Sequence, residues 1–306
     1  MADISPLSPE VRRREDNDGG DTSLLGKARI IIVRVAVGTY NDGFTFAGNF
    51  AYLALLAVFS FFIVTAAIAG SFGDTAIGIE FVAAFLGTVP PSVADVLREP
   101  IRDAMAARTG PLLWFSAAVG LWTTASLVET IRGILHRSYG VSATRPFWEY
   151  RLTSIAMIVA SVVLAMLALS TQVAVASLEQ FFGRYTLLPQ FSALWVSLTR
   201  IIPFLVLFTT LYILFRILTP RQYRGSGYPK WPGAVFISGW WLVTTALLPL
   251  FLFYAADYKL TYGSLAGVMI TLIFFYLVGL GMVIGAELNA ALAEAPRRIY
   301  KEQDAT

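Results

Sequence analysis

Long runs of apolar residues without any charge recur along the chain, and short polar segments separate them. The clearest of these runs cover residues 43–73, 110–128, 152–178, 231–256 and 260–286. Each run is long enough for a helix that crosses a bilayer, which needs about 20 apolar residues, and too long for the roughly 9–11 residues of a barrel strand. Because a helix satisfies its backbone hydrogen bonds internally, the runs predict membrane-spanning helices.

A further run is shorter, because only fifteen uncharged residues separate Arg200 from Arg216. That length is below the roughly 17 residues that a span requires, so we expect this helix to begin earlier, near Leu194. Arg200 then lies at membrane depth. Its side chain can extend to the outer interface or line a polar cavity, and the sequence leaves both interpretations open.

Together, the runs predict an all-α membrane protein with six transmembrane helices, at about 47–72, 110–130, 152–178, 194–216, 233–256 and 262–286. These spans form one transmembrane domain over residues 24–295, between a disordered cytosolic tail (1–23) and a cytosolic tail at residues 296–306. Seventeen of the 23 Lys and Arg residues fall on the side that holds both termini. This bias predicts that both termini lie in the cytosol.

Two segments outside the spans also have helical patterns. Residues 24–37 place apolar positions near one helical face, which predicts an amphipathic helix lying on the cytosolic membrane surface. Residues from about 74 to 108 predict a small helical cap on the extracytoplasmic side. In this cap we expect Ser92 to cap a helix that Pro100 kinks or ends.

Composition agrees with a membrane protein and narrows its chemistry. Of the 306 residues, 57% are hydrophobic and only 14% are charged, whereas a soluble domain carries about 25% charged residues. There is no cysteine, and the one histidine, His136, falls in a predicted basic loop. No nucleophile elbow, phosphate-binding loop or dinucleotide fingerprint occurs. We therefore expect no enzyme, no catalytic residue, no metal and no cofactor.

Polar residues within or beside the spans are the main functional candidates, because burying them in lipid is expensive. The candidates for a cavity or gate are Asp42, Asn49, Arg145, Arg200, Glu287 and Asn289. A helix C-terminus disfavours an acid, so we expect a basic partner for Glu287, which ends the last span. Glu287 either locks helices together through an ion pair or lines a cytosol-facing polar pocket. Glu129 ends another span, and we expect it close to Arg132 and Arg145.

Prolines and glycines mark candidate hinges and helix contacts. Pro203 and Pro249 lie inside predicted spans, where each either kinks the helix beside a transport site or simply shapes it. The last span has two pairs of glycines at the spacing that lets helices approach closely, Gly263 with Gly267 and Gly281 with Gly285. This spacing is compatible with internal packing, and also with a moving contact or a homo-oligomer interface.

Three sequence blocks resemble a known family. They are Asp42 followed by residues 49–56, then residues 139–148, and finally residues 262–265 with 285–290. In order and spacing they resemble the YihY/virulence factor BrkB family, whose members were once labelled ribonuclease BN, over about residues 27–295. The resemblance implies six transmembrane helices in a bacterial inner membrane and no settled activity. Members have been linked to envelope integrity, serum resistance and lipid export.

The leading hypothesis is a transporter or lipid-translocating protein of the bacterial envelope with an internal polar cavity. An anionic amphiphile would meet Arg200 from outside, and Glu287, Arg145 and Asn289 would form a cytosolic gate. Its partners would be membrane lipids and not nucleic acid. The alternative is a structural scaffold that binds an envelope partner through residues 74–108. An intramembrane enzyme is a remoter alternative, and RNA cleavage is not expected because no aqueous metal or acid/base cluster is visible.

Overall fold

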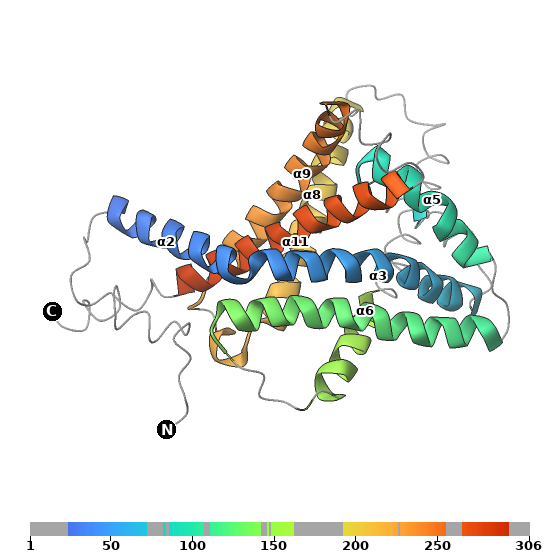
Figure 1. Cartoon of the computed structure of the whole chain (residues 1–306), viewed down its shortest axis with the longest axis horizontal. Helices are drawn as coiled ribbons and strands as arrows, with labels where there is room; N and C mark the ends of the chain where they lie inside the picture. The colour runs from blue at the N-terminus through green and yellow to red at the C-terminus, as the bar shows by residue number, and fades with distance from the viewer. Residues whose placement is uncertain are drawn as a thin grey trace.

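The structure is a computed structural model, and all regular elements in its described residues are helices (Figure 1). This confirms the predicted all-helical class. The described residues are 24–71, 82–83, 86–87, 89–106, 111–141, 146, 148–161, 192–225, 227–254 and 265–293. Both predicted cytosolic tails and the first part of the predicted cap lie outside these residues.

The first two helices meet at a sharp bend. Helix α2 (Leu24–Gly38) continues through the π-helical turn η2 (Thr39–Gly43) into α3 (Phe44–Ser71). The segments on either side of this turn are inclined at 62° to each other. Helix α2 leaves Ile32, Val33 and Val37 exposed. Exposed apolar side chains on a helix suit the membrane surface, so the interfacial position of α2 stays a prediction with this support.

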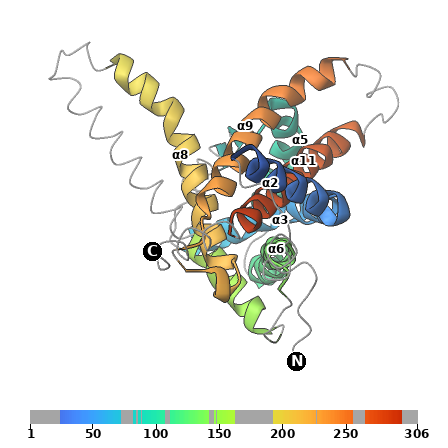
Figure 2. The ribbon, with the colours of Figure 1, turned by 90° about the vertical axis from the view of Figure 1, so that its left-hand side faces the viewer.

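Helix α11 (Ala266–Ala293) is the centre of the bundle, because it contacts α2, α3, α5 (Pro91–Ala106), α6 (Pro111–Ser138) and α9 (Trp231–Tyr254). Helices α3 and α6 run side by side, and α9 packs between α11 and α8 (Ser192–Leu218) (Figures 1 and 2). Large apolar side chains such as Phe274 and Ile134 are fully buried between these helices. Residues 148–161 are also helical.

Two helices of the described part are long and apolar enough to cross a membrane. They are α9, over Trp231–Leu250, and α11, and the bent pair of α2 and α3 would be a third. Helices α8 and α9 also expose apolar side chains such as Leu205, Val206 and Leu247. Such a surface suits lipid better than water. The count of six spans and the cytosolic position of both termini stay predictions.

Helix α6 is longer than its apolar run, which corrects one expectation. We expected the span to end near residue 130 and His136 to lie in a loop, but the helix continues to Ser138. Gly140, two residues beyond its end, has a φ of 62°. The amide of Val141 bonds to the carbonyl of His136 at 2.8 Å, and that of Gly140 to the carbonyl of Arg137 at 2.9 Å. This is the Schellman arrangement, which requires a residue with positive φ.

Helix α5 also differs from its prediction. It begins at Pro91, not after a Ser92 cap, and it continues through Pro100 to Ala106. A proline fits the first helical position because its missing N–H would have had no partner there. The buried face continues across Pro100 with Leu97 and Ile101, both fully buried. Packing of this apolar face therefore outweighs the hydrogen bond that Pro100 removes.

Candidate functional site: a charged pocket beside helix α6

Several predicted site residues fall where the structure describes no side chain. Arg145 and Gly263 lie outside the described residues. Asp42 is in η2, and Arg200 and Pro203 are in α8, but their side chains are outside the described part. Their assignment to a cavity, gate or hinge stays a prediction.

Asn289 ties α11 to the start of α9. Its side-chain oxygen accepts a hydrogen bond from the Gly233 amide at 2.8 Å, and its nitrogen donates one to the Lys230 carbonyl at 3.1 Å. The Gly233 amide belongs to the first turn of α9, where backbone donors lack a partner within the helix. Asn289, 1% exposed, therefore caps α9 through the amide of a residue 56 positions earlier in the chain.

Glu287 lies at the junction between α11 and α2. It is buried, and its carboxylate packs directly on Gly38, where a Cβ atom would collide with it. Only a glycine at position 38 permits this approach. The position fits a carboxylate that fixes α2 to α11, and both the lock and the gate interpretations remain compatible with it.

The remaining candidates lie at contacts between helices of the same chain or on the surface. The Asn49 amide donates a hydrogen bond to the Thr130 hydroxyl at 3.2 Å, which connects α3 to α6. Pro249 is exposed inside α9. The three described glycines of the predicted pairs face side chains of α5 and α9: Gly267 faces Val96, Gly281 faces Trp240 and Gly285 faces Ile237.

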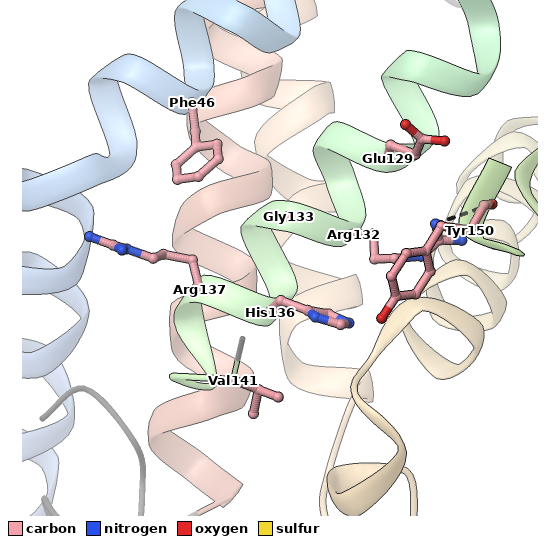
Figure 3. Close-up of a pocket in the computed structure, with 8 residues that line it drawn as sticks. All are labelled: Phe46, Glu129, Arg132, Gly133, His136, Arg137, Val141 and Tyr150. Atoms are coloured by element: carbon pink, nitrogen blue, oxygen red, sulfur yellow. Dashed lines mark hydrogen bonds between the residues drawn. The ribbon is translucent and has the colours of Figure 1, made fainter. Parts of the chain in front are cut away.

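A pocket of about 330 Å³ lies beside the C-terminal end of α6 (Figure 3). One face of α6 supplies most of its wall, because residues spaced by three and four positions lie together on a helix. Phe46 of α3, Val141 and Tyr150 complete the lining. The α6 residues are Glu129, Arg132, Gly133, His136 and Arg137. The Schellman turn at Gly140 reverses the chain and brings Val141 back to the pocket.

Glu129 forms an ion pair with Arg151, a residue that the sequence did not single out. Its Oε2 lies 3.0 Å from Arg151 Nη1. The same nitrogen donates to the Ser126 hydroxyl at 3.1 Å, and the guanidinium carbon lies 3.9 Å from the centre of the Trp122 ring. The other carboxylate oxygen of Glu129 is buried and has no hydrogen-bond partner among the described residues. The negative charge of Glu129 is thus already matched by Arg151.

Arg132 is held against the helix that follows the pocket. Its two terminal nitrogens donate to the Tyr150 carbonyl at 3.4 Å and to the Ser154 hydroxyl at 3.3 Å. Its guanidinium also lies over the Tyr150 ring, 4.7 Å from the centroid. These contacts fix a positive charge in the pocket wall.

His136 lies in the pocket wall beside Arg132 and Tyr150, whose side chains stack on each other (Figure 3). Its ring meets the Tyr150 ring edge-on, with centroids 6.2 Å apart. Burial, and then the positive charges of Arg132 and Arg224, lower the pKa of His136 below its ordinary value of 6.5. Among the described residues, neither imidazole nitrogen has a hydrogen-bond partner. The imidazole is therefore mainly neutral near neutral pH.

Arg224 brings a further positive charge from another part of the chain. It follows the short 3-10 helix η4 (Arg221–Tyr223) and donates hydrogen bonds to the Ile217 and Thr219 carbonyls at the end of α8. A helix C-terminus attracts a cation, so Arg224 is held in place. With Arg132 and Arg137 it gives the pocket region an excess of positive charge.

The pocket is suited to a small anionic group. Its volume is at the lower end of the roughly 300–1,000 Å³ typical of ligand sites. Guanidinium groups bind phosphate and carboxylate through several directed hydrogen bonds. Within the described ranges, no group of three or more His, Cys, Asp and Glu side chains could hold a metal ion.

The family model named virulence factor BrkB matches residues 38–306. The chain belongs to the virulence factor BrkB family. This BrkB-family protein is also similar to the putative ribonuclease-like protein YfkH of Bacillus subtilis (strain 168). The two are 28% identical over 265 residues, which cover 83% of this chain and 91% of YfkH. No solved structure matches the chain. Family and apolar helices together identify an envelope membrane protein.

The sequence interpretation missed most of this pocket. It set aside His136 as a loop or interface residue, and it did not consider Tyr150 or Arg151. One signal was available, because positions 129, 132, 133, 136 and 137 have helical spacing. That pattern begins where the apolar run ends, so it looked like an ordinary cytosolic charge cluster.

Proposed function

We propose that this BrkB-family protein translocates an anionic amphiphile, such as an anionic lipid, in the bacterial inner membrane. In this proposal both termini are cytosolic and the pocket beside α6 receives the headgroup. The observation that carries it is the unbalanced positive charge of the pocket. Two guanidinium groups, those of Arg132 and Arg137, line the pocket, whereas the lining carboxylate of Glu129 already forms an ion pair with Arg151 at 3.0 Å.

The place of the pocket supports the same function. It lies at the end of α6 beyond the predicted span, where a lipid headgroup would meet the cytosolic interface. Its volume of about 330 Å³ holds a headgroup but not acyl chains. The chains would stay in lipid beside the bundle, where α6 exposes Trp114, Val119 and Trp122.

The test is a translocation assay in proteoliposomes with headgroup-matched fluorescent lipids. Fluorescent phosphatidylglycerol should cross the bilayer faster with protein than in empty vesicles. The protein should accelerate the crossing of fluorescent phosphatidylcholine less. Equal rates with and without protein, over several anionic lipids, would contradict the proposal.

A variant that fills the pocket tests whether the lipid flux depends on it. A Cβ on Gly133 would meet only Phe46 Cε1, at 3.9 Å, so a larger side chain fits the helix and fills the pocket. Gly133→Leu should abolish the flux without loss of folded protein. The matched control is Gly48→Leu on α3, because a Cβ at Gly48 has no neighbour within 4 Å. If both variants transport equally well, the flux does not use this pocket.

A scaffold that binds an envelope partner is the second candidate, and α5 is the observation in its favour. This helix buries Val93 and Leu97 and exposes a charged face of Asp95, Arg98, Glu99 and Arg102. A solvated charged face on an extracytoplasmic cap would suit a protein partner. Reversing Arg98 and Arg102 to Glu should then remove a crosslinked partner in cells while leaving lipid flux in vesicles unchanged.

A further inference from the structure

His136 is the one pocket group that can change its charge near neutral pH. Its imidazole contributes to the lining, and no hydrogen bond to either ring nitrogen is formed within the described residues. The other described cations near it, Arg132, Arg137 and Arg224, keep their charge at all relevant pH values. An imidazole that lines a pocket without a partner can accept a proton whenever its surroundings favour the charged form.

The surroundings of His136 oppose that charge while the pocket holds no anion. The Arg132 and Arg224 guanidinium groups repel a second positive charge, and burial adds to the effect. Glu129 lies about two helical turns away on α6, and its charge is matched by Arg151. Tyr150 meets the imidazole with its ring edge and adds no charge. From α3, the pocket lining includes only the apolar Phe46.

An anion in the pocket reverses this balance. An opposite charge within about 4–6 Å raises the pKa of a histidine by about one to three units. The anion would neutralise part of the guanidinium charge and could accept a hydrogen bond from the protonated ring. Binding of the anion and binding of a proton therefore favour each other, and linkage makes the effect equal in both directions.

We propose that the pocket binds its anion together with one proton, which His136 takes up as the anion enters. This inference rests on the proposed function, because it assumes that an anionic headgroup occupies the pocket. It identifies the ligand as an anion without a compensating positive charge, such as a phosphodiester headgroup of the phosphatidylglycerol type. A zwitterionic headgroup would bring its own cation and would favour the protonated imidazole less.

The sequence makes this inference directly measurable, because His136 is the only histidine among 306 residues. A histidine-selective isotope label in the full chain, purified through an affinity tag without histidine, gives one imidazole NMR signal. That signal is followed from about pH 5 to about pH 8, around the ordinary histidine pKa. The titration is repeated with dihexanoyl phosphatidylglycerol, whose phosphodiester keeps one charge over this range, and with dihexanoyl phosphatidylcholine.

The expected result is a pKa of His136 that phosphatidylglycerol raises by about one unit or more and that phosphatidylcholine leaves nearly unchanged. Saturable phosphatidylglycerol binding with an unchanged pKa would overturn the inference and leave the proposed function standing. If phosphatidylglycerol binds no better than phosphatidylcholine at any pH, the proposed function fails together with the inference.

A variant tests the coupling without NMR. For the wild type, phosphatidylglycerol affinity should rise as pH falls below neutrality, by up to about tenfold per pH unit for one coupled proton. His136→Gln cannot take up the proton and should show no such rise, whatever its affinity near pH 8. A variant that keeps the wild-type pH dependence would overturn the inference.

Discussion

Two polar regions of the bundle differ in whether their polar atoms have hydrogen-bond partners. At the contact of α9 with α11, Asn289 has a partner for both its oxygen and its nitrogen, at 2.8 and 3.1 Å. At the pocket beside α6, one buried Glu129 oxygen has no partner within the described part of the chain, and the partly exposed His136 imidazole forms no hydrogen bond there. Each region places polar residues at a predicted span end, but only the α9–α11 contact, through Asn289, held a residue that the sequence marked as a candidate.

The difference separates structural from functional polar residues. A buried polar group with all its hydrogen bonds stabilises one arrangement of the chain, and nothing is left over for a ligand. An unmatched polar group beside an open volume costs stability unless something binds there. The α9–α11 contact should therefore respond to mutation through folding, and the α6 pocket should respond mainly through ligand binding.

The largest loss of stability should come from a larger side chain at the contact between α9 and α11. A Cβ on Gly233 would collide with the Gly285 carbonyl oxygen and the Asn289 amide, neither of which can move freely. Gly233→Ala should lower the free energy of unfolding by about 3 kcal/mol, the upper part of the usual range for overpacking. Thermal unfolding in detergent measures the change. Gly239→Ala on the same helix is the control, since its Cβ has open space, and an equal loss there would refute the close-contact explanation.

Removing the Asn289 side chain, which caps α9, should cause the next largest loss of stability. Asn289→Ala leaves the Gly233 amide and the Lys230 carbonyl without their partner, which should cost about 2 kcal/mol of unfolding free energy. Asn49→Ala loses one longer bond from an exposed amide, at 3.2 Å to Thr130, and should cost clearly less. Unfolding of the two variants side by side gives the comparison. Equal costs would mean that the Asn289 clamp contributes little.

Neutralising Glu129 should affect both the stability of the protein and its binding of phosphatidylglycerol. Glu129→Gln removes the charge that pairs with buried Arg151, and we expect a loss of about 1 kcal/mol because the glutamate is partly exposed. The same change should strengthen phosphatidylglycerol binding several-fold, because the pocket loses its negative charge. Exposed Glu99 on α5 offers a control with the same charge change, Glu99→Gln. Weaker anion binding in Glu129→Gln would contradict the electrostatic picture of the pocket.

The smallest effect should appear in stability as a function of pH. Burial and neighbouring guanidinium groups hold the pKa of His136 below 6.5, so the unfolded chain binds this proton more readily than the folded one. Stability from this residue is complete above about pH 6.5 and is lost as pH falls through the lower folded-state pKa. Unfolding curves in that range should therefore be steeper in pH for the wild type than for His136→Gln. Identical pH dependences would count against the buried neutral imidazole.

The apolar runs predicted most helices, because lipid-facing and core positions are both apolar and such helices appear in the sequence as long apolar segments. Helix ends were harder to predict. The last apolar run ends at Ala286, yet α11 continues to Ala293, because Glu287 and Asn289 are buried against α2 and α9. A hydropathy pattern does not show that a polar side chain is buried when its partners lie far away in the sequence. Gly140 was the local signal for the true end of α6.

The candidate site was less predictable than the fold, because its contacts join distant residues. Glu129 and Arg151 are 22 positions apart, and no regular spacing on one helix relates them. Arg224 approaches His136 from beyond α8. Asn289 was among the predicted cavity or gate residues, but its two hydrogen bonds to the start of α9 depend on how α9 and α11 pack. Only the stripe of polar positions on α6 was visible in the sequence.

The most direct test of this contrast is to locate a bound anionic lipid on the protein. Phosphatidylglycerol with a photoreactive headgroup is crosslinked to the full chain in phosphatidylcholine nanodiscs, and the labelled peptides are mapped by mass spectrometry. The account predicts labelling of residues around 129–150, which excess unlabelled phosphatidylglycerol suppresses and Gly133→Leu removes. Labelling at the α9–α11 contact, or labelling near α6 that neither competitor nor variant reduces, would contradict it.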